Sequence, residues 1–349
     1  MFSFLRPYIF NLDPETAHDL AIKSLKIDLI PETFFNIPGE DLLEVNVFDK
    51  SFKNPIGLAA GFDKSAEVYN SLFKLGFGFV EVGTITPKRQ FGNPKPRVFR
   101  LEKDNALINR LGFNNDGVDE VQKRLMRNQA RGILGINVGP NKSTKNKEED
   151  YIICIKQLHN FADYITINIS SPNTEDLRKF HEKENFFNLL KNIQKTKTEN
   201  NFKKPFLIKI SPDIVENDIS HIIELSLRFK IDGIIISNTT DKNRSNLTDK
   251  NKDEIGGLSG KPINGLSNKL IKRFYKETKG KLTIIGVGGI DSGSCVFEKL
   301  TSGASLVQLY TGLIYKGPSI VKDIKSELIN ILKREKITKL SDIIGSSSK

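Results

Sequence analysis

Glycine, asparagine, serine and threonine residues gather at the carboxyl ends of a series of short apolar runs, with almost no carboxylate among them. Glycine lets backbone N–H groups approach a ligand closely, and amide and hydroxyl side chains offer neutral hydrogen bonds. A site with these groups suits a large anionic ligand that makes many hydrogen bonds. The residues are Ala60, Gly61, Gly83, Thr84, Asn137, Asn168, Lys209, Ser237, Asn238, Thr239, Gly288, Gly289, Tyr310, Thr311 and Gly312.

Two of these positions indicate an anion. Lys209 ends an apolar run, and burying its ammonium group without a counter-charge costs free energy, so we expect an anionic partner such as a phosphate or a reduced flavin. The glycine-rich run at 286–289 is either a phosphate cradle or a structural turn. It fails the GxGxxG pattern of dinucleotide-binding turns, because Asp291 stands where the third glycine would be.

The metal-ligating residue types are too scattered to predict a metal site. Cys154 and Cys295 are far apart and lack CxxC spacing, which also argues against a disulfide framework. No pair of histidines has the spacing of a zinc site. The histidines are His18, His159, His181 and His221.

The apolar runs themselves predict the fold. Each is short and rich in β-branched residues, and each is followed by a longer helical stretch, as in a parallel sheet covered by helices. Eight such units predict a closed (β/α)8 barrel, in which active sites lie at the carboxyl ends of the strands. The runs are 55–60, 79–84, 133–139, 164–170, 205–210, 233–239, 282–289 and 306–312.

Two segments interrupt the regular alternation. Residues 86–101 contain three prolines and a glycine, which predicts an inserted hairpin or loop after the second strand. Residues 241–264 form a long polar stretch after the sixth strand, of the kind that serves as a lid or binding loop.

The first 40 residues lie outside the barrel pattern and predict two short helices. Residues 2–10 are rich in aromatic side chains, and Asp13 followed by Pro14 is typical of a helix start. The segment is either an arm packed on the barrel or an amphipathic element that docks on a membrane. We expect a helical arm at 1–40, the barrel at 41–335 and a polar tail at 336–349. One apolar helix face is expected from Ala17, Leu20, Ala21, Ser24 and Leu25, followed by Phe34, Phe35 and Ile37.

The net charge of +11 is compatible with nucleic acid, a membrane surface or small anions as partners. Lysines are spread over the expected helices rather than interleaved with aromatic residues, which favours a solvated surface and no nucleic-acid partner. No apolar run reaches the ~18 residues that a bilayer span requires, and no signal peptide is evident. We therefore expect a cytosolic or peripheral membrane protein.

Six motifs at compatible spacing resemble those of dihydroorotate dehydrogenases, in order along the chain from about Asp13 to Pro318. They are AAGFDK at 59–64, VGTITP at 82–87, NRLGFNN at 109–115, NISSPNT at 168–174, GGLSG at 256–260 and GVGGID at 286–291. The N-terminal arm and Ser171, at the catalytic-base position where class 1 enzymes carry cysteine, resemble the class 2, quinone-dependent group.

The resemblance implies FMN as cofactor, bound over the mouth of the barrel. Two positions depart from the family pattern: Ser237 stands in place of threonine and keeps the hydroxyl, and Phe62 replaces a usual leucine. We expect neither to affect the chemistry. The implied FMN contacts are Ala60, Gly61, Phe62, Asp63, Lys64, Thr84, Asn137, Asn168, Lys209, Ser237, Gly260, Gly289, Tyr310 and Thr311.

The resemblance also implies the substrate and the base. Ser171 would accept a proton from dihydroorotate as orotate forms, and it would pass a proton onward through Thr174 and water beside Phe113. Amides suit the ring's carbonyl and N–H groups, and a cation suits its carboxylate. The implied substrate contacts are Lys64, Asn109, Arg110, Leu111, Gly112, Phe113, Asn168, Asn173, Asn238 and Thr239.

Class 2 membership would make a membrane quinone the electron acceptor, with His18, Arg100 and Tyr310 as its candidate contacts. It would also place the protein on an anionic lipid surface, at the cytoplasmic face of a bacterial inner membrane, without an obligate protein partner. Two alternatives remain at this point. One is a class 1 enzyme with fumarate or NAD as soluble acceptor, and the other is a basic RNA-binding protein without flavin, whose binding would depend steeply on salt.

Overall fold

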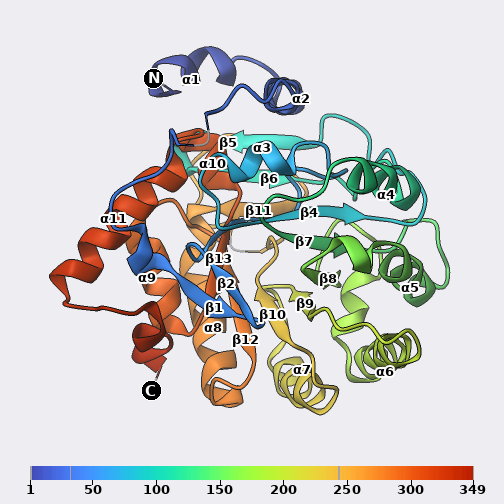
Figure 1. Ribbon diagram of the computed structural model, residues 1–349. Helices are drawn as coiled ribbons and strands as arrows, with labels where there is room; N and C mark the ends of the chain where they lie inside the picture. The colour runs from blue at the N-terminus through green and yellow to red at the C-terminus, as the bar shows by residue number, and fades with distance from the viewer. Residues whose placement is uncertain (1, 32, 243, 349) are drawn as a thin grey trace.

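The computed structural model describes residues 2–31, 33–242 and 244–348. Its centre is a closed barrel of parallel strands in the order β10-β12-β13-β3-β4-β7-β8-β9 (Figure 1). Each of the eight apolar runs forms one strand, which confirms the predicted (β/α)8 fold. The strands are β3 (Ile56–Leu58), β4 (Phe79–Ile85), β7 (Ile133–Val138), β8 (Tyr164–Asn168), β9 (Phe206–Ile210), β10 (Gly233–Ile236), β12 (Thr283–Val287) and β13 (Leu306–Leu309).

Helices cover the outer face of the barrel, and a short hairpin of β1 (Val45–Val47) and β2 (Lys50–Phe52) precedes it (Figure 1). The helices turn their apolar sides inward; α11, for example, buries Ile324, Leu328 and Leu332 at the three-to-four-residue spacing of one face. The helices are α3 (Tyr69–Phe73), α4 (Val118–Arg127), α5 (Lys147–Leu158), α6 (Lys183–Glu199), α7 (Glu216–Arg228), α8 (Asn264–Thr278), α9 (Gly293–Ser302), α10 (Thr311–Lys316) and α11 (Ile320–Arg334).

The two interruptions of the barrel pattern join in one small sheet. The insertion after β4 supplies β5 (Val98–Leu101) and β6 (Ala106–Asn109), and the stretch after β10 supplies β11 (Gly257–Gly260), which pairs antiparallel with β6. The sheet has its own apolar core, formed by Leu101, Ala106, Ile108, Leu247, Leu258 and Ile263. The hairpin expected after the second strand is therefore present, and the long polar stretch contributes its third strand.

The N-terminal arm forms two helices, α1 (Phe2–Phe10) and α2 (Pro14–Lys26), which lie at one end of the molecule near β5 and α10 (Figure 1). The Asp13 carboxylate caps α2 by accepting hydrogen bonds from the backbone N–H groups of residues 15 and 16, as the sequence predicts.

The buried Arg97 guanidinium donates three hydrogen bonds to the Glu15 carboxylate. Arg100 donates to the backbone oxygens of Phe10 and Leu12 at 3.1 and 2.8 Å. Polar contacts thus fix the arm on the inserted sheet.

The apolar face expected for α2 differs from the observed one. Ala21 and Leu25 pack against the core and Ile22 is buried, whereas Leu20 is 51% exposed. The arm is therefore packed on one side and carries exposed apolar side chains on the other.

Several large apolar side chains of the arm remain exposed: Phe4 (76%), Tyr8 (68%), Leu29 (82%) and Phe34 (60%). Among the helices of the described residues, none combines the length and apolar character that a bilayer span requires. At the other end of the chain, residues 336–348 follow α11 and bury Leu340 and Ile343.

Candidate functional site

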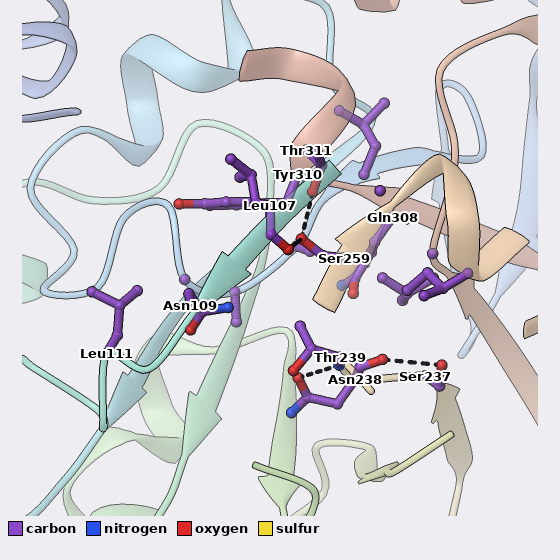
Figure 2. A pocket seen from close by; sticks show the side chains of 18 of the residues that line it. Leu107, Asn109, Leu111, Ser237, Asn238, Thr239, Ser259, Gln308, Tyr310 and Thr311 are labelled. Carbon is purple, nitrogen blue, oxygen red and sulfur yellow. Dashed lines mark hydrogen bonds between the residues drawn. The ribbon is translucent and has the colours of Figure 1, made fainter. Parts of the chain in front are cut away.

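A cavity that is partly open to solvent lies at the carboxyl ends of the barrel strands. The inserted sheet supplies one wall through Leu107, Asn109 and Ser259, and loops that follow β10 and β13 supply others (Figure 2). Ser259 on β11 and Thr311 at the start of α10 are joined by a hydrogen bond of 2.8 Å between their hydroxyl oxygens. The sheet is therefore attached directly to the barrel at the cavity.

Most of the residues expected to hold a cofactor line this cavity. The cavity-lining ones are Ala60, Gly61, Lys64, Thr84, Asn168, Lys209, Ser237, Gly260, Gly289, Tyr310 and Thr311. Three others do not line it. The Asp63 carboxylate accepts hydrogen bonds from the backbone N–H groups of Glu67 and Val68 and thereby holds the turn after β3. Phe62 turns toward His18, and Asn137 lies fully buried in the barrel.

The residues expected to contact the substrate also meet at the cavity, with one exception. Asn109, Leu111, Gly112, Phe113, Asn173, Asn238 and Thr239 line it, together with Lys64 and Asn168. Arg110 does not: its guanidinium donates to the Glu254 carboxylate at 2.8 Å and to the Ile255 oxygen at 2.9 Å. Arg110 therefore ties the inserted hairpin to the loop before β11.

Ser171 lies on the cavity wall and is buried, at 6% exposed. Its hydroxyl oxygen accepts a hydrogen bond of 3.2 Å from the backbone N–H of Asn173. That contact stabilises negative charge on the oxygen, which favours a serine that gives up a proton. Thr174 is buried near this loop without lining the cavity, and Phe113 lines it with a backbone φ of 55°.

Lys64 and Lys209 line the cavity, as do Lys261 and Lys316, and together they give it positive charge. Burial lowers the pKa of Lys64 to about 8, and the nearby carboxylates of Glu15, Asp19 and Asp63 oppose that shift. Burial also lowers the pKa of Lys209, which lines the cavity at 5% exposed. Within the described part of the chain, no group accepts a hydrogen bond from the Lys209 ammonium.

Arg178, which the motifs do not single out, connects two loops of the site. Its guanidinium donates to the backbone oxygens of Ser170 and Thr239 at 3.3 and 3.2 Å. It also forms ion pairs of 3.1 Å with Asp213 and with Asp241. The loop that follows β8 and carries Ser171 is thus held against the loop that follows β10.

The three candidate quinone residues lie between the arm and the cavity. The His18 ring lies edge-on to Phe62 at 5.1 Å, and Phe62 lies 6.2 Å from Tyr310, which lines the cavity. Burial and the neighbouring Lys64 charge lower the pKa of His18 to about 3, so its ring is neutral. Arg100 packs its guanidinium 4.6 Å over the Phe10 ring. An aromatic path therefore runs from α2 to the cavity wall.

Gln308 and Ser259 are among the cavity residues that the sequence analysis does not identify. Gln308 lies in the middle of β13, and its side-chain oxygen is buried without a hydrogen-bond partner. Ser259 lies inside the quoted GGLSG motif but was not selected. A polar residue inside a short apolar strand is the signal that points to Gln308, since burying an amide requires a partner.

Comparisons with known proteins agree with this geometry. The family model described as dihydroorotate dehydrogenase matches residues 42–332. A Rhodopseudomonas palustris (strain BisA53) protein named dihydroorotate dehydrogenase (quinone) is 43% identical, covering 98% of this chain and 94% of its own. A Buchnera aphidicola subsp. Schizaphis graminum protein of the same name is 45% identical, with 93% and 99% covered.

Solved structures extend the similarity to three dimensions. The crystal structure of the Eimeria tenella enzyme in complex with ferulenol superposes with a TM-score of 0.91 at 38% identity, covering 97% of this chain and 96% of that one. The ligand-free structure from the same organism gives a TM-score of 0.90 at 39% identity, covering 97% and 100%. The fold, the cavity and the extent of these matches lead to one conclusion: this chain belongs to the dihydroorotate dehydrogenase family.

Proposed function

We propose that this chain oxidises dihydroorotate to orotate for pyrimidine synthesis, with FMN as its flavin and a membrane quinone as electron acceptor. The observation that carries the proposal is the buried Lys209, which lines a cavity walled by amides and hydroxyls. Burying a cation in this way is stable when an anionic or electron-rich ligand faces it. Family membership supplies the reaction.

The residues around the cavity fit a flavin. Dihydroorotate dehydrogenases are flavin-dependent, and the bound flavin supplies the hydride acceptor. Lys209 offers a donor and the Gln308 side-chain oxygen an unused acceptor, as a ring with both carbonyl and N–H groups requires. Gly61 lies on the cavity wall with a φ of 110°, a conformation that favours glycine. If the residue carried a Cβ, the nearest atom to it would belong to Tyr310, 4.0 Å away. The proposed FMN-holding residues are Ala60, Gly61, Lys64, Thr84, Asn168, Lys209, Ser237, Gly260, Gly289, Tyr310 and Thr311, with Phe62, Asp63 and Asn137 supporting them from behind.

The substrate residues act by binding and by moving a proton. Asn109, Asn173 and Asn238 present amides to the ring edges, and Lys64 attracts the carboxylate. Ser171 takes a proton from carbon as its own hydroxyl proton leaves, and the Asn173 N–H stabilises its oxygen. Thr174 and Phe113 flank the proposed exit of that hydroxyl proton. Lys209 would stabilise the negative charge of the flavin once it has accepted hydride.

The arm is the proposed quinone entrance. His18, Arg100 and Tyr310 border the path from α2 to the cavity, and the exposed Phe4, Tyr8 and Phe34 provide an apolar surface for lipid. The +11 net charge would strengthen attachment to anionic lipid. We place the protein at the cytoplasmic face of a bacterial inner membrane, as a peripheral protein.

Anaerobic spectroscopy tests this proposal. The purified protein is expected to be yellow, and dihydroorotate is expected to bleach the flavin band in the absence of oxygen. Adding a long-tailed quinone should restore the band faster than fumarate or NAD does. A colourless protein that FMN cannot reconstitute would overturn the flavin assignment, and faster reoxidation by a soluble acceptor would overturn the quinone assignment alone.

A further inference from the structure

A carboxylate that the proposed chemistry does not use lies inside the barrel. Glu81 on β4 is fully buried and accepts four hydrogen bonds from three other strands. The donors are the Asn137 amide at 2.8 Å, the Tyr164 hydroxyl at 3.0 Å, the Thr166 hydroxyl at 3.2 Å and the Gln308 amide at 2.9 Å. Because Tyr164 on β8 and Gln308 on β13 are not on strands adjacent to β4, the contact must be in the barrel interior.

Four donors face the Glu81 carboxylate. Hydrogen bonds to a carboxylate are stronger than those between neutral groups. Burying a lone carboxylate is costly, and an apolar side chain of similar size would fill the space more cheaply. A functional reason for the charge should therefore be found nearby.

One reason is a chain of hydrogen bonds that runs from the cavity to Glu81, with every donor pointing the same way. The Asn238 amide donates to the Ser170 hydroxyl at 2.8 Å, which donates to the Asn168 side-chain oxygen at 2.7 Å. The Asn168 amide donates to the Thr84 hydroxyl at 3.0 Å, which donates to the Asn137 oxygen at 2.7 Å. Asn137 then donates to Glu81.

This direction fixes which atoms the cavity residues present. An amide or hydroxyl chain can in principle run either way, but a carboxylate can only end it as an acceptor. Asn168 and Asn238 line the cavity, so their orientation decides where a ligand meets a donor and where it meets an acceptor. Glu81 thereby selects one hydrogen-bonding pattern for the site.

The other reason is the charge of Lys209. Burial lowers its pKa, and Glu81 is the one charged group of the described residues whose field opposes that shift. Its strand neighbours, Asn168 on β8 and Ile235 on β10, carry no charge. Tyr164 is the other titratable group beside Glu81, and burial keeps its pKa well above the usual value, so it stays neutral.

We propose that Glu81 is a positioning residue of the site, which orients the amides of the cavity through this chain and balances the charge of Lys209 from inside the barrel. The proposal rests on the proposed function, because it concerns how that site is kept ready for flavin and substrate. Glu81 itself touches neither.

Replacing the carboxylate by its amide tests both parts. The rate of flavin reduction by dihydroorotate should decline at alkaline pH, where Lys209 loses its proton. In Glu81→Gln this decline should occur at a pH about one unit or more lower than in the wild type, because Lys209 loses its proton at lower pH. Orotate binding, followed through the flavin difference spectrum, should weaken roughly tenfold. The reason is that the new amide can donate as well as accept, so the direction of the hydrogen bonds in the chain can reverse. Tyr164→Phe is the matched control: it removes one donor and leaves the charge, so the alkaline decline should stay in place.

Two further measurements do not depend on turnover. With lysine labelled at 13Cε and the Lys209 signal assigned by its loss in Lys209→Met, the amine should titrate at lower pH in Glu81→Gln than in the wild type. The free energies of unfolding of the wild type, the two single variants and Glu81→Gln/Lys209→Met together form a double-mutant cycle. The double variant should be more stable than the sum of the single changes predicts, because it leaves neither charge unbalanced, and it should fold even if Glu81→Gln alone does not.

The outcomes separate this proposal from the proposed function. An unchanged Lys209 titration together with additive stabilities would overturn the role of Glu81. If the alkaline decline in rate shifts equally in Glu81→Gln and Tyr164→Phe, Glu81 acts only through packing, and the proposal is also overturned. A wild type that dihydroorotate cannot reduce would overturn the function instead, while the stability cycle would still report on Glu81.

Discussion

Ser171 is held in the cavity wall with its oxygen already accepting a hydrogen bond from the Asn173 N–H. Ser171→Ala should keep flavin and orotate binding but slow flavin reduction by roughly 10²- to 10⁴-fold, the usual contribution of a positioned base. Stopped-flow absorbance under anaerobic conditions measures this rate. Ser171→Cys should retain part of the activity and shift its pH profile to lower values, since a thiol ionises more readily. A normal reduction rate in the alanine variant would remove Ser171 from the mechanism.

Lys64 gives the substrate site a pH dependence of its own. Burial lowers its pKa to about 8, so the ammonium is charged below that pH and neutral above it. Orotate affinity should therefore fall above pH 8, by up to about tenfold for each unit. Titrating orotate into the protein between pH 6.5 and 9.5 measures the effect. Lys64→Arg should abolish the alkaline loss because it stays charged; an affinity that is constant over this range in the wild type would contradict the assignment.

At the scale of elements, the loops after β8 and β10 are held together by Arg178, which contacts Ser170, Thr239, Asp213 and Asp241. Arg178→Leu should lower kcat/KM for dihydroorotate by roughly 10- to 100-fold, since small displacements of Ser171 are costly to catalysis. The flavin spectrum should change little, because Arg178 contacts Ser170 and Thr239 and not the flavin-holding Asn168 or Ser237.

Steady-state kinetics with a soluble artificial acceptor isolates this effect from quinone access. Arg110→Leu is a useful comparison, because Arg110 ties the inserted hairpin to Glu254 and lies away from the cavity wall. If the two variants lose activity equally, the loss reflects loop order in general, and the specific contact of Arg178 with the loop of Ser171 would not be the cause.

At the scale of the whole molecule, the arm and the barrel should carry separable functions. Deleting residues 1–38 should leave flavin reduction by dihydroorotate largely intact, because every proposed catalytic and flavin-binding residue lies beyond Asn54. Reoxidation by a long-tailed quinone and binding to anionic liposomes should each fall by roughly tenfold or more. The deletion also leaves buried Arg97 without Glu15, so a lower unfolding temperature is expected.

Point variants avoid that loss of stability. Phe4→Glu and Tyr8→Glu change side chains that are 76% and 68% exposed, so the fold should tolerate them. Both should weaken liposome binding and activity with long-tailed quinone, and both should preserve turnover with a soluble acceptor. Met126→Glu, also an exposed apolar residue at 68%, lies on α4 and should change neither. Full activity of the arm variants with long-tailed quinone would mean that the arm is only packing.

The sequence by itself determined the barrel. Parallel strands that are buried on both faces must be apolar along their length, so each strand is visible as a short run, and the groups at its carboxyl end must share one face. The start of α2 was equally readable, since Asp13 and Pro14 act within one turn of helix. In both cases the signal is local in the sequence, although the contacts of the barrel strands are not.

Only the tertiary structure decided which distant segments meet. Pairing of β6 with β11 joins residues about 150 positions apart, and no periodicity encodes that partner. The same is true of the Arg178 contacts and of Glu81, whose donors come from three strands brought together by closure of the barrel. Which apolar side chains of α2 face the barrel was also decided by packing, since Ile22 is buried and Leu20 is 51% exposed. The local pattern of apolar and polar residues predicts burial and secondary structure. Which distant segments contact one another is decided by the geometry of the closed barrel.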